Sequence, residues 1–460
     1  MIAMTLAEIA RVLDAGLHDV PDPEAVVTAP PVVDSREVLS GGLFAATPGA
    51  RADGHDFAAG AVASGAVAVL AARPVGVPAI VVEDVQTALG TLARHVLSRL
   101  DPTVIALTGS VGKTTTKDLL AQLLEPKAPT IATDRSFNNE LGLPLTVLRA
   151  DAGTRYLVLE MGAGRKGDLT YLTRIAPPHL SLVLNVGAAH VSRMGGGLAD
   201  VAEAKGELVE ALPPDGYALL NADDPYVLGM ASRTKAEVVL YGRSADAVVR
   251  AEDVTLDEAA RAAFDLVTPS GRARVELGLV GAHQVANALG AAAVAVALGM
   301  SAGEIAAGLS TATRRSPGRF EITERPDGVT VINDAYNANP ESMRAGLHAF
   351  KALAGGRRTI AVLGGMGQQA EASQARHAEM GELVATLGID VLITVGDDVG
   401  QRAMAREAQD AGAGVRVHPV DEVGQATRLA VELIEPGDVV FVKASSEYGL
   451  GACARELAAG

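Results

Sequence analysis

The amino-acid sequence predicts an α/β protein that is divided into three domains. Short apolar runs, each ended by glycine or a polar residue, alternate with stretches of helical spacing. That alternation is typical of mostly parallel sheets covered by helices. The chain has 460 residues, whereas single hydrophobic cores stop growing at about 250–300 residues. A break at Asp101-Pro102 and an Arg- and Pro-containing segment at 313–320 divide the chain into domains 1–98, 99–312 and 313–460.

The composition excludes several classes of protein. Hydrophobic residues make up 48% and charged residues 20%, and tryptophan is absent, so a globular core must be built from Val, Leu, Ile and Ala. The net charge of −16, without a Lys/Arg-rich stripe, argues against a nucleic-acid partner. The single Cys453 cannot form an internal disulfide, and the sequence has neither a signal-peptide pattern nor a run of 18 apolar residues. We therefore expect a cytoplasmic protein that is not inserted in a membrane. The sequence does not determine the oligomeric state, and a monomer is our working expectation.

The first domain is expected to alternate short strands and helices. Residues 32–49 are typical of strand, turn and strand, residues 55–72 of a helix followed by a strand, and residues 79–100 of a strand followed by a helix. That last helix must end before Asp101-Pro102, because the residue before proline is disfavoured in helical conformation.

The two larger domains carry the clearest strand signals. In the middle domain the apolar runs are VIALTG (104–109), RYLVLEMG (155–162), LSLVLNVG (180–187), YALLN (217–221) and EVVLYG (237–242). An antiparallel excursion is expected at 250–280, and the Ala-rich segment before residue 300 is expected to be a buried helix. In the third domain the runs are VTVIND (329–334), RTIAVLGG (358–365), DVLITVG (390–396), VRVHPV (415–420) and DVVFVKAS (438–445), which predict a doubly wound, Rossmann-like sheet.

The segment VIALTGSVGKTTT (104–116) has the layout of a phosphate-binding loop, in which a buried strand, a Gly-rich turn and a helix follow one another. Leu107 stands where the full motif has glycine, so only the core G-x-x-G-K-T is present. Backbone N–H groups of this loop would cradle phosphates at a helix N-terminus, Lys113 would reach the outer phosphates, and the Thr114 hydroxyl would bind Mg²⁺. The predicted ATP-binding loop comprises Gly109, Ser110, Val111, Gly112, Lys113, Thr114 and Thr115.

Other polar residues follow predicted strands, where ligands of parallel sheets bind. Glu160 ends one strand and His190 follows the next. Glu160 suits Mg²⁺, whereas a histidine ligand is more usual for Mn²⁺. Taken alone, each residue favours a structural interpretation over a ligand: Glu160 as a capping or salt-bridged carboxylate, His190 as a hydrogen-bonded loop histidine, and Lys205 as a solvent-facing lysine on an amphipathic helix.

Three further groups of residues are candidates for ligand contact. Asn138 and Asn139 suit a polar turn before a helix, either as a cap or as a ligand contact. The segment 333–343 concentrates amide and carboxylate groups, among them Asp334, Asn337 and Asn339, and this density favours a ribose or phosphate. Arg319 could be brought onto a transferring phosphate by a closing motion, or could be a solvated linker arginine.

These residues belong to eight motifs that occur in the same order and spacing in the Mur ligase family, which the chain therefore resembles over nearly its whole length. The motifs are TGSVGKTTT (108–116), EMGAGRKGDL (160–169), NVGAAHV (185–191), EAKGEL (203–208), NADDP (221–225), GAHQVANALGAAAVA (281–295), GRFEI (318–322) and DAYNANPESM (334–343). Together with DSR (34–36) and SFNNELGLPLTVL (136–148), they are most similar to the members that join D-alanyl-D-alanine to a UDP-N-acetylmuramoyl-tripeptide.

The resemblance implies a role for each matching residue. Thr114 and Glu160 would bind one Mg²⁺, His190 would help to hold a second, and Lys205 would be carbamylated by CO₂ and bridge the metals. Asn287 would contact adenine, with His283 close by; Arg319 would contact the γ-phosphate and Asp334 the ribose. Further substrate contacts would come from Ser35 and Arg36 to the uridine diphosphate, and from Asn138, Asn139, Asn337 and Asn339. The implied reaction is ATP-dependent amide formation through an acyl phosphate.

The chain departs from the family pattern at several positions, and other functions stay open. Val111 stands where asparagine is usual, Gly365 replaces an acidic residue, Gln368-Gln369-Ala370 replaces Glu-Leu-Gly, and Ser446 replaces a common arginine. All but the first lie in the domain that receives the amine, so a related ligase with a different acceptor is the alternative. A folylpolyglutamate-synthase-like enzyme and a nucleotide-responsive binding protein are the other candidates. The sequence does not distinguish diaminopimelate from lysine in the tripeptide.

Overall fold

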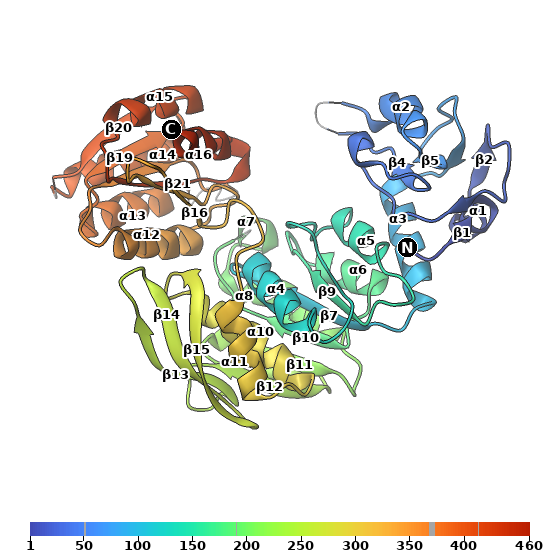
Figure 1. The fold of residues 1–460 in the computed structure, drawn as a ribbon, viewed down its shortest axis with the longest axis horizontal. Helices are drawn as coiled ribbons and strands as arrows, with labels where there is room; N and C mark the ends of the chain where they lie inside the picture. The colour runs from blue at the N-terminus through green and yellow to red at the C-terminus, as the bar shows by residue number, and fades with distance from the viewer. Residues whose placement is uncertain (50–51, 190, 368–372, 413) are drawn as a thin grey trace.

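The protein consists of three α/β parts arranged in an arc, as the computed structural model shows (Figure 1). The structure describes residues 1–49, 52–189, 191–367, 373–412 and 414–460. The N-terminal part is followed by the middle sheet and then by the C-terminal sheet. Among the described residues, no helix is both long enough and apolar enough to cross a membrane.

The N-terminal part contains a small mixed sheet. Its strand order is β2 (Gly16–His18), β6 (Ala79–Val81), β5 (Ala68–Ala71), β4 (Leu43–Ala45), and a separate pair joins β1 (Met4–Thr5) to β3 (Val26–Val27). Its helices are α1 (Leu6–Leu13), α2 (Ala58–Ala63) and α3 (Val85–Ser98). The strand expected at the start of 32–49 is only an isolated bridge between Val32 and Phe44, because Ser35–Glu37 coils into a short 3₁₀ helix, η1.

The middle part is a nine-stranded sheet with the order β15-β14-β13-β12-β11-β10-β7-β9-β8. The strands from β13 to β8 in this order run parallel, and β14 and β15 extend the edge antiparallel, as predicted for 250–280. Their bounds are β7 (Thr103–Thr108), β8 (Thr130–Ala132), β9 (Tyr156–Glu160), β10 (Leu180–Val183), β11 (Tyr217–Asn221), β12 (Glu237–Gly242), β13 (Val249–Leu256), β14 (Arg261–Thr268) and β15 (Gly271–Val280). The short edge strand β8 has no apolar run long enough to predict it.

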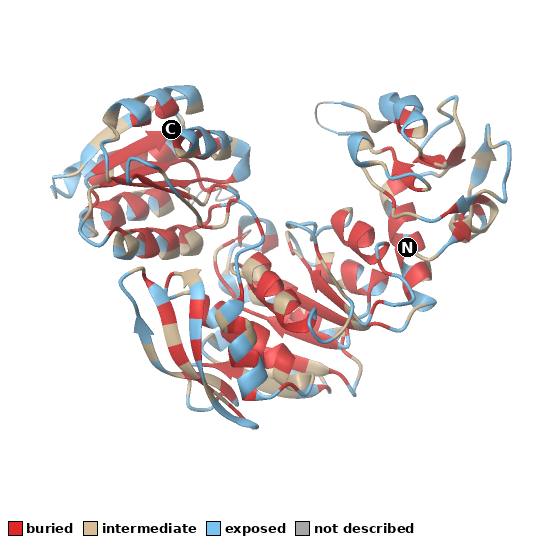
Figure 2. Ribbon diagram, in the orientation of Figure 1, coloured by how far each residue is buried: buried red, intermediate tan, exposed pale blue. Residues whose placement is uncertain are grey.

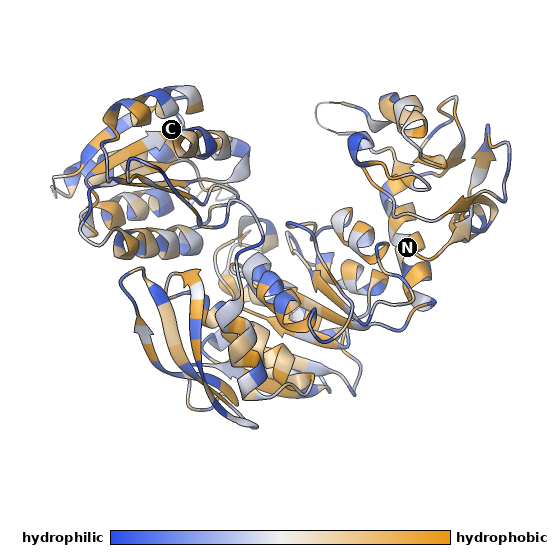
Figure 3. Cartoon of the chain, viewed as in Figure 1, coloured by the Kyte–Doolittle hydropathy of each residue, from blue (hydrophilic) through white to orange (hydrophobic). Residues whose placement is uncertain are grey.

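Helices cover both faces of the middle sheet. They are α4 (Lys113–Leu124), α5 (Gly142–Val147), α6 (Asp168–Ile175), α7 (Val191–Met194), α8 (Leu198–Glu210), α9 (Pro225–Leu228), α10 (Gln284–Ala297) and α11 (Ala302–Thr311). One core lies under α4, α10 and α11, and the other lies under α5, α6 and α8 and continues into α1 and α3 of the N-terminal part. Figure 2 shows the buried residues along the strands and inner helix faces, and Figure 3 shows that these positions are apolar.

The C-terminal part is a six-stranded, doubly wound sheet with the order β16-β17-β21-β18-β19-β20. Its strands are β16 (Glu321–Glu324), β17 (Thr330–Asn333), β18 (Thr359–Leu363), β19 (Val391–Val395), β20 (Arg416–Val420) and β21 (Val439–Lys443). The helices α12 (Pro340–Ala354), α13 (Ser373–Thr386) and α14 (Val399–Asp410) cover one face, and α15 (Val423–Leu433) and α16 (Leu450–Ala459) cover the other.

The α/β class, the three-domain organisation and the parallel sheets are confirmed, while boundaries at residues 98 and 312 stay predictions. The antiparallel edge strand β16 was not expected. Its four residues, Glu-Ile-Thr-Glu, are half-buried or exposed and include one aliphatic side chain, so they lack the apolar run that marks the buried strands.

Candidate active site

A cavity of about 900 Å³ lies where β7 and β9 end, between the middle and C-terminal parts. Parallel strands place their carboxyl ends at one edge, so the residues that follow them meet there. The sequence-predicted residues that line this cavity are Gly109, Ser110, Val111, Gly112, Lys113, Thr114, Thr115, Asn138, Asn139, Glu160, Lys205, Arg319, Asn337 and Asn339. Residues separated by up to 230 positions in sequence thus line the same cavity.

The phosphate loop turns sharply before α4. Gly112 has φ +84°, and a Cβ at this position would lie 2.3 Å from Asn287 Oδ1, so both conformation and space require glycine. Asn185, which follows β10, accepts from Val111 N at 2.9 Å and donates to Val111 O at 3.1 Å. Because only the Val111 backbone is used, the loop tolerates valine in place of asparagine. In the sequence, Asn185 could be recognised as the polar residue that directly follows the apolar run 180–184.

Glu160 is a buried carboxylate at the end of β9. Its side chain is held by Asn138, whose Nδ2 donates to Oε1 at 2.6 Å, while Oε2 has no hydrogen-bond partner in the described part of the chain. A buried carboxylate oxygen without a partner is costly unless a cation balances it. Together with the Thr114 hydroxyl in the same cavity, this oxygen donor set fits a hard divalent cation such as Mg²⁺.

Two lysines of the cavity are held in an environment that disfavours their charge. Burial lowers the pKa of Lys113, and Glu160 opposes that change. Burial and the nearby charge of Lys113 lower the pKa of Lys205 well below the ordinary value of lysine. Lys205 is 2% exposed, so the interpretation as a solvent-facing lysine is wrong. On α8 it shares the buried face with Val201, Ala204 and Leu208. These positions are three or four residues apart, which is the spacing of one helix face.

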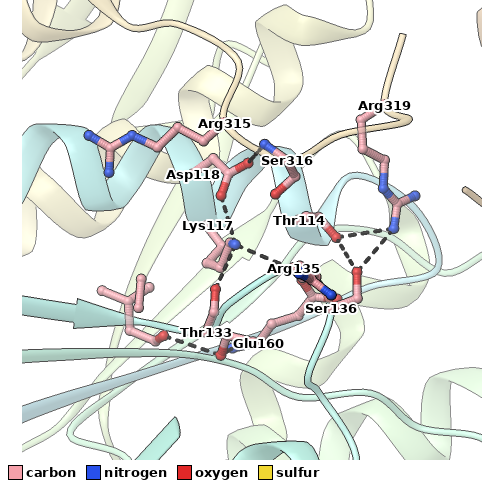
Figure 4. Close-up of polar contacts among 12 residues, drawn as sticks. Thr114, Lys117, Asp118, Thr133, Arg135, Ser136, Glu160, Arg315, Ser316 and Arg319 are labelled. Carbon is pink, nitrogen blue, oxygen red and sulfur yellow. Dashed lines mark hydrogen bonds and ion pairs between the residues drawn. The ribbon is translucent and has the colours of Figure 1, made fainter. Parts of the chain in front are cut away.

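Arg319 reaches the phosphate loop from the segment between the two large sheets (Figure 4). Its Nη2 donates to Thr114 Oγ1 and to Ser136 Oγ, both at 3.2 Å, and these two hydroxyls are 3.1 Å apart. The guanidinium also lies 4.3 Å from the centre of the Tyr336 ring, which favours a cation. Arg319 is therefore a half-buried cation of the cavity and not a solvated linker residue. Ser136 and Tyr336 were not among the predicted site residues.

The same segment is docked on α4 by a second set of contacts. Asp118 accepts from Ser316 N at 3.1 Å and pairs with Lys117 at 2.7 Å (Figure 4). Lys117 Nζ also donates to Thr133 O at 2.7 Å. Lys117 is buried with its partners around it, so we assign it to positioning the segment rather than to chemistry.

The motif 334–343 surrounds the C-terminal side of the cavity without placing every member in it. Asp334 accepts from Phe320 N at 2.9 Å and pairs with Lys443 Nζ at 2.6 Å, and it does not line the cavity. Asn339 caps α12, and its Nδ2 lies 3.5 Å from Ser110 O. Asn337 lines the cavity, and its backbone oxygen accepts from Lys443 at 2.9 Å.

Other predicted residues lie away from the cavity. Asn287 sits behind Gly112 and donates to Gln284 at 2.8 Å, and burial lowers the pKa of neighbouring His283 to about 4. Ser35 and Arg36 lie on the N-terminal part, where Arg36 is exposed and pairs with Asp34. His190 and Gln368-Gln369-Ala370 lie outside the described residues.

One of the departures has a local structural explanation. Gly365 faces the Tyr448 ring, because a Cβ there would lie 2.1 Å from Tyr448 Cζ. Ser446 lines the cavity, and nothing in the structure explains a serine at this position.

The phosphate loop, the doubly wound third sheet and the shared cavity define a three-domain nucleotide-binding protein. Family models match in three segments: "Mur ligase family, catalytic domain" at 32–96, "Mur ligase middle domain" at 107–295, and "Mur ligase, glutamate ligase domain" at 318–446. The chain belongs to the Mur ligase family.

Full-length relatives agree with this assignment. The chain is 45% identical to a Mycobacterium bovis protein named UDP-N-acetylmuramoyl-tripeptide--D-alanyl-D-alanine ligase, over 100% of this chain and 98% of the relative. It is similar to crystal structures of MurF from Acinetobacter baumannii (TM-score 0.85, 30% identity, 100% and 99% of the two chains). It is also similar to MurF ligase from Thermotoga maritima in complex with ADP (TM-score 0.77, 30% identity, 94% and 98%).

Proposed function

We propose that this protein uses ATP to join D-alanyl-D-alanine to UDP-N-acetylmuramoyl-tripeptide, forming the pentapeptide precursor of peptidoglycan. The Mycobacterium bovis relative, which matches over 100% of this chain and 98% of its own length, is named for this activity. The observation that carries the proposal is that Lys113, Thr114, Glu160, Lys205 and Arg319 line one cavity. That set combines a phosphate loop, oxygen ligands and a cation from the third domain.

The reaction proceeds through two substitutions. A carboxylate oxygen of the tripeptide attacks the γ-phosphorus of ATP, and the bond to the bridging oxygen breaks, which gives an acyl phosphate and ADP. The amine of D-alanyl-D-alanine then attacks the acyl carbon, the carbon–oxygen bond breaks, phosphate leaves, and the new amide nitrogen releases a proton. Lys113 and Arg319 stabilise the negative charge on the transferring group.

Thr114 and Glu160 would hold a divalent cation, Mg²⁺ or Mn²⁺, which would supply charge neutralisation at the phosphates. His190 would help to hold a second ion. Burial lowers the pKa of Lys205, which favours the neutral amine that reacts with CO₂, and its carbamate would add anionic oxygens to the cavity. Asn138 orients Glu160 through its 2.6 Å hydrogen bond.

The remaining assignments follow the family motifs. Ser35 and Arg36 would bind the uridine diphosphate, Asn287 the adenine and Asp334 the ribose. Asn139, Asn337 and Asn339 would contact substrate at the cavity wall. ATP and a UDP-linked substrate place the proposed reaction in the cytoplasm, and we expect a monomer, which light scattering of the eluting protein would test.

A phosphate-release assay tests the proposal. ATP and UDP-muramoyl-tripeptide are held constant while the acceptor is varied among D-alanyl-D-alanine, other dipeptides and single amino acids. We expect release to require the tripeptide nucleotide and D-alanyl-D-alanine together. Turnover with another amine, and none with this dipeptide, would replace the acceptor and leave the ligase chemistry in place. Parallel assays with diaminopimelate and lysine forms of the tripeptide identify its third residue.

A further inference from the structure

The first turn of α12 contacts the middle part at a peptide that the proposed chemistry does not use. Glu341 Oε1 accepts from Ala188 N at 2.6 Å. Arg376 of α13 donates to Ala188 O at 3.4 Å, so the backbone N–H and C=O of Ala188 both bind side chains of the C-terminal part. The contact therefore joins two parts of the molecule at one residue.

The Ala188 peptide is coupled to the phosphate loop. Ser110 Oγ accepts from Gly187 N at 2.7 Å and donates to Gly187 O at 3.1 Å. Ser110 N in turn donates to Asn185 O at 3.1 Å. The loop after β10 and the phosphate loop thus form one hydrogen-bonded unit, and a force on Ala188 is transmitted to Ser110 through two adjacent peptides.

The fit between Glu341 and this unit is close. A Cβ at Gly187 would lie 2.8 Å from Glu341 Oε1, and its three nearest atoms would all belong to Glu341. Gly187 does not have a positive φ, so an alanine there meets this side chain rather than backbone strain. Glu341 Oε2 is buried and has no hydrogen-bond partner among the described residues. The N-terminal end of α12 favours the negative charge.

We propose that Glu341 is a positioning residue that docks the C-terminal part on the phosphate-loop unit through the Ala188 amide. Docking at this point places Arg319 and the acceptor side of the cavity in register with the phosphates. The inference rests on the proposed function for its effect on turnover, but the contact itself can be measured without any substrate.

Amide hydrogen exchange and turnover test the proposal together. Because a charge-assisted hydrogen bond is lost, Glu341→Ala should speed exchange of the Ala188 amide about tenfold or more and lower kcat by about tenfold to a hundredfold. KM for ATP should change much less. Glu341→Gln keeps an acceptor oxygen and should restore most of the protection of the Ala188 amide. Glu379→Ala removes an exposed carboxylate of α13, 3.7 Å from Arg344, and serves as the matched control.

A double-mutant cycle separates docking from a general loss of stability. Gly187→Ala displaces the Glu341 carboxylate and should reproduce the Glu341→Ala phenotype, and the double variant should be no worse than either single variant. Additive effects, unchanged exchange at Ala188, or an equal effect of Glu379→Ala would overturn the proposal. Loss of turnover in every variant and the wild type, with the expected exchange pattern intact, would instead count against the proposed substrates only.

Discussion

Arg319 Nη2 lies 3.2 Å from Thr114 Oγ1, so a cation attached to the third domain contacts the hydroxyl that we assign to metal binding. The same nitrogen also reaches Ser136. The hydroxyl of Thr114 in the middle part is thereby in contact with a side chain of the C-terminal part. Under the proposed function, phosphoryl transfer at this point would depend on where the C-terminal part places the Arg319 guanidinium.

Replacement of Arg319 by alanine should lower the rate of phosphoryl transfer by about a hundredfold to a thousandfold, because one positioned donor to the developing charge is lost. Single-turnover formation of ADP with ATP and the tripeptide nucleotide measures this step directly. Arg315→Ala removes a neighbouring arginine that pairs with Glu125 at the surface, and it should change the rate by less than about threefold. Equal losses in the two variants would contradict the assignment.

Gly112→Ala should destabilise the protein and weaken nucleotide binding at least about tenfold. An alanine at φ +84° costs about 1–2 kcal/mol, and its Cβ would in addition collide with Asn287. Gly299 has the same φ of +84° with nothing near its Cβ position, so Gly299→Ala supplies the backbone cost alone. Calorimetric titration with ATP and thermal unfolding measure both effects. If Gly112→Ala and Gly299→Ala behave alike, the close approach of Asn287 is unimportant.

Glu160→Gln should weaken Mn²⁺ binding in the presence of ADP by more than about tenfold, since it removes a buried anionic oxygen that has no other partner. Asn138→Ala frees the carboxylate from its orienting amide and should weaken binding by a smaller factor. Electron paramagnetic resonance of bound Mn²⁺ gives the affinities without turnover. Wild-type affinity in the Glu160→Gln protein would exclude Glu160 as a ligand.

Lys205→Met should raise the free energy of unfolding near neutral pH in buffer freed of CO₂. The pKa of Lys205 is lower in the folded chain than in the unfolded chain, so the unfolded chain binds the proton more tightly. Stability contributed by this residue is therefore lost as pH falls below the unfolded pKa of about 10.4, and it returns as pH rises toward that value.

Urea unfolding of both proteins at about pH 7 and about pH 9 measures this difference. The gain from methionine should be larger at the lower pH. Added bicarbonate should alter the stability of the wild type and leave Lys205→Met unchanged, because only an amine forms a carbamate. A urea unfolding curve of the wild type that does not change on addition of bicarbonate would argue against carbamylation of Lys205.

The sequence predicted the sheets well because buried parallel strands need uninterrupted apolar runs. The run at 155–162 became β9, and Glu160 stands at its carboxyl end, where the parallel arrangement requires. The edge strands β8 and β16 were missed because three or four half-exposed residues leave no such run.

Within the candidate site, the sequence could indicate chemistry but not every neighbour. Ser136 meets Thr114 only because separate loops follow β7 and β8, and a lone serine carries no periodic signal. Tyr336 likewise packs on Arg319 only because the antiparallel pairing of β16 with β17 brings the segment before one strand close to the loop after the other. Lys205 was interpreted from the sequence as a solvent-facing lysine, although its helical spacing to Val201 and Leu208 puts it on the buried face of α8.

The stretch 313–320 is both the covalent tether of the last sheet and the carrier of Arg319. A displacement of that sheet that pulls on this segment would therefore also move the Arg319 guanidinium relative to Thr114 and Ser136. Movement of the C-terminal sheet and movement of the Arg319 positive charge would then occur together. Lengthening this segment by a few residues would let the sheet move without moving the Arg319 guanidinium by the same amount.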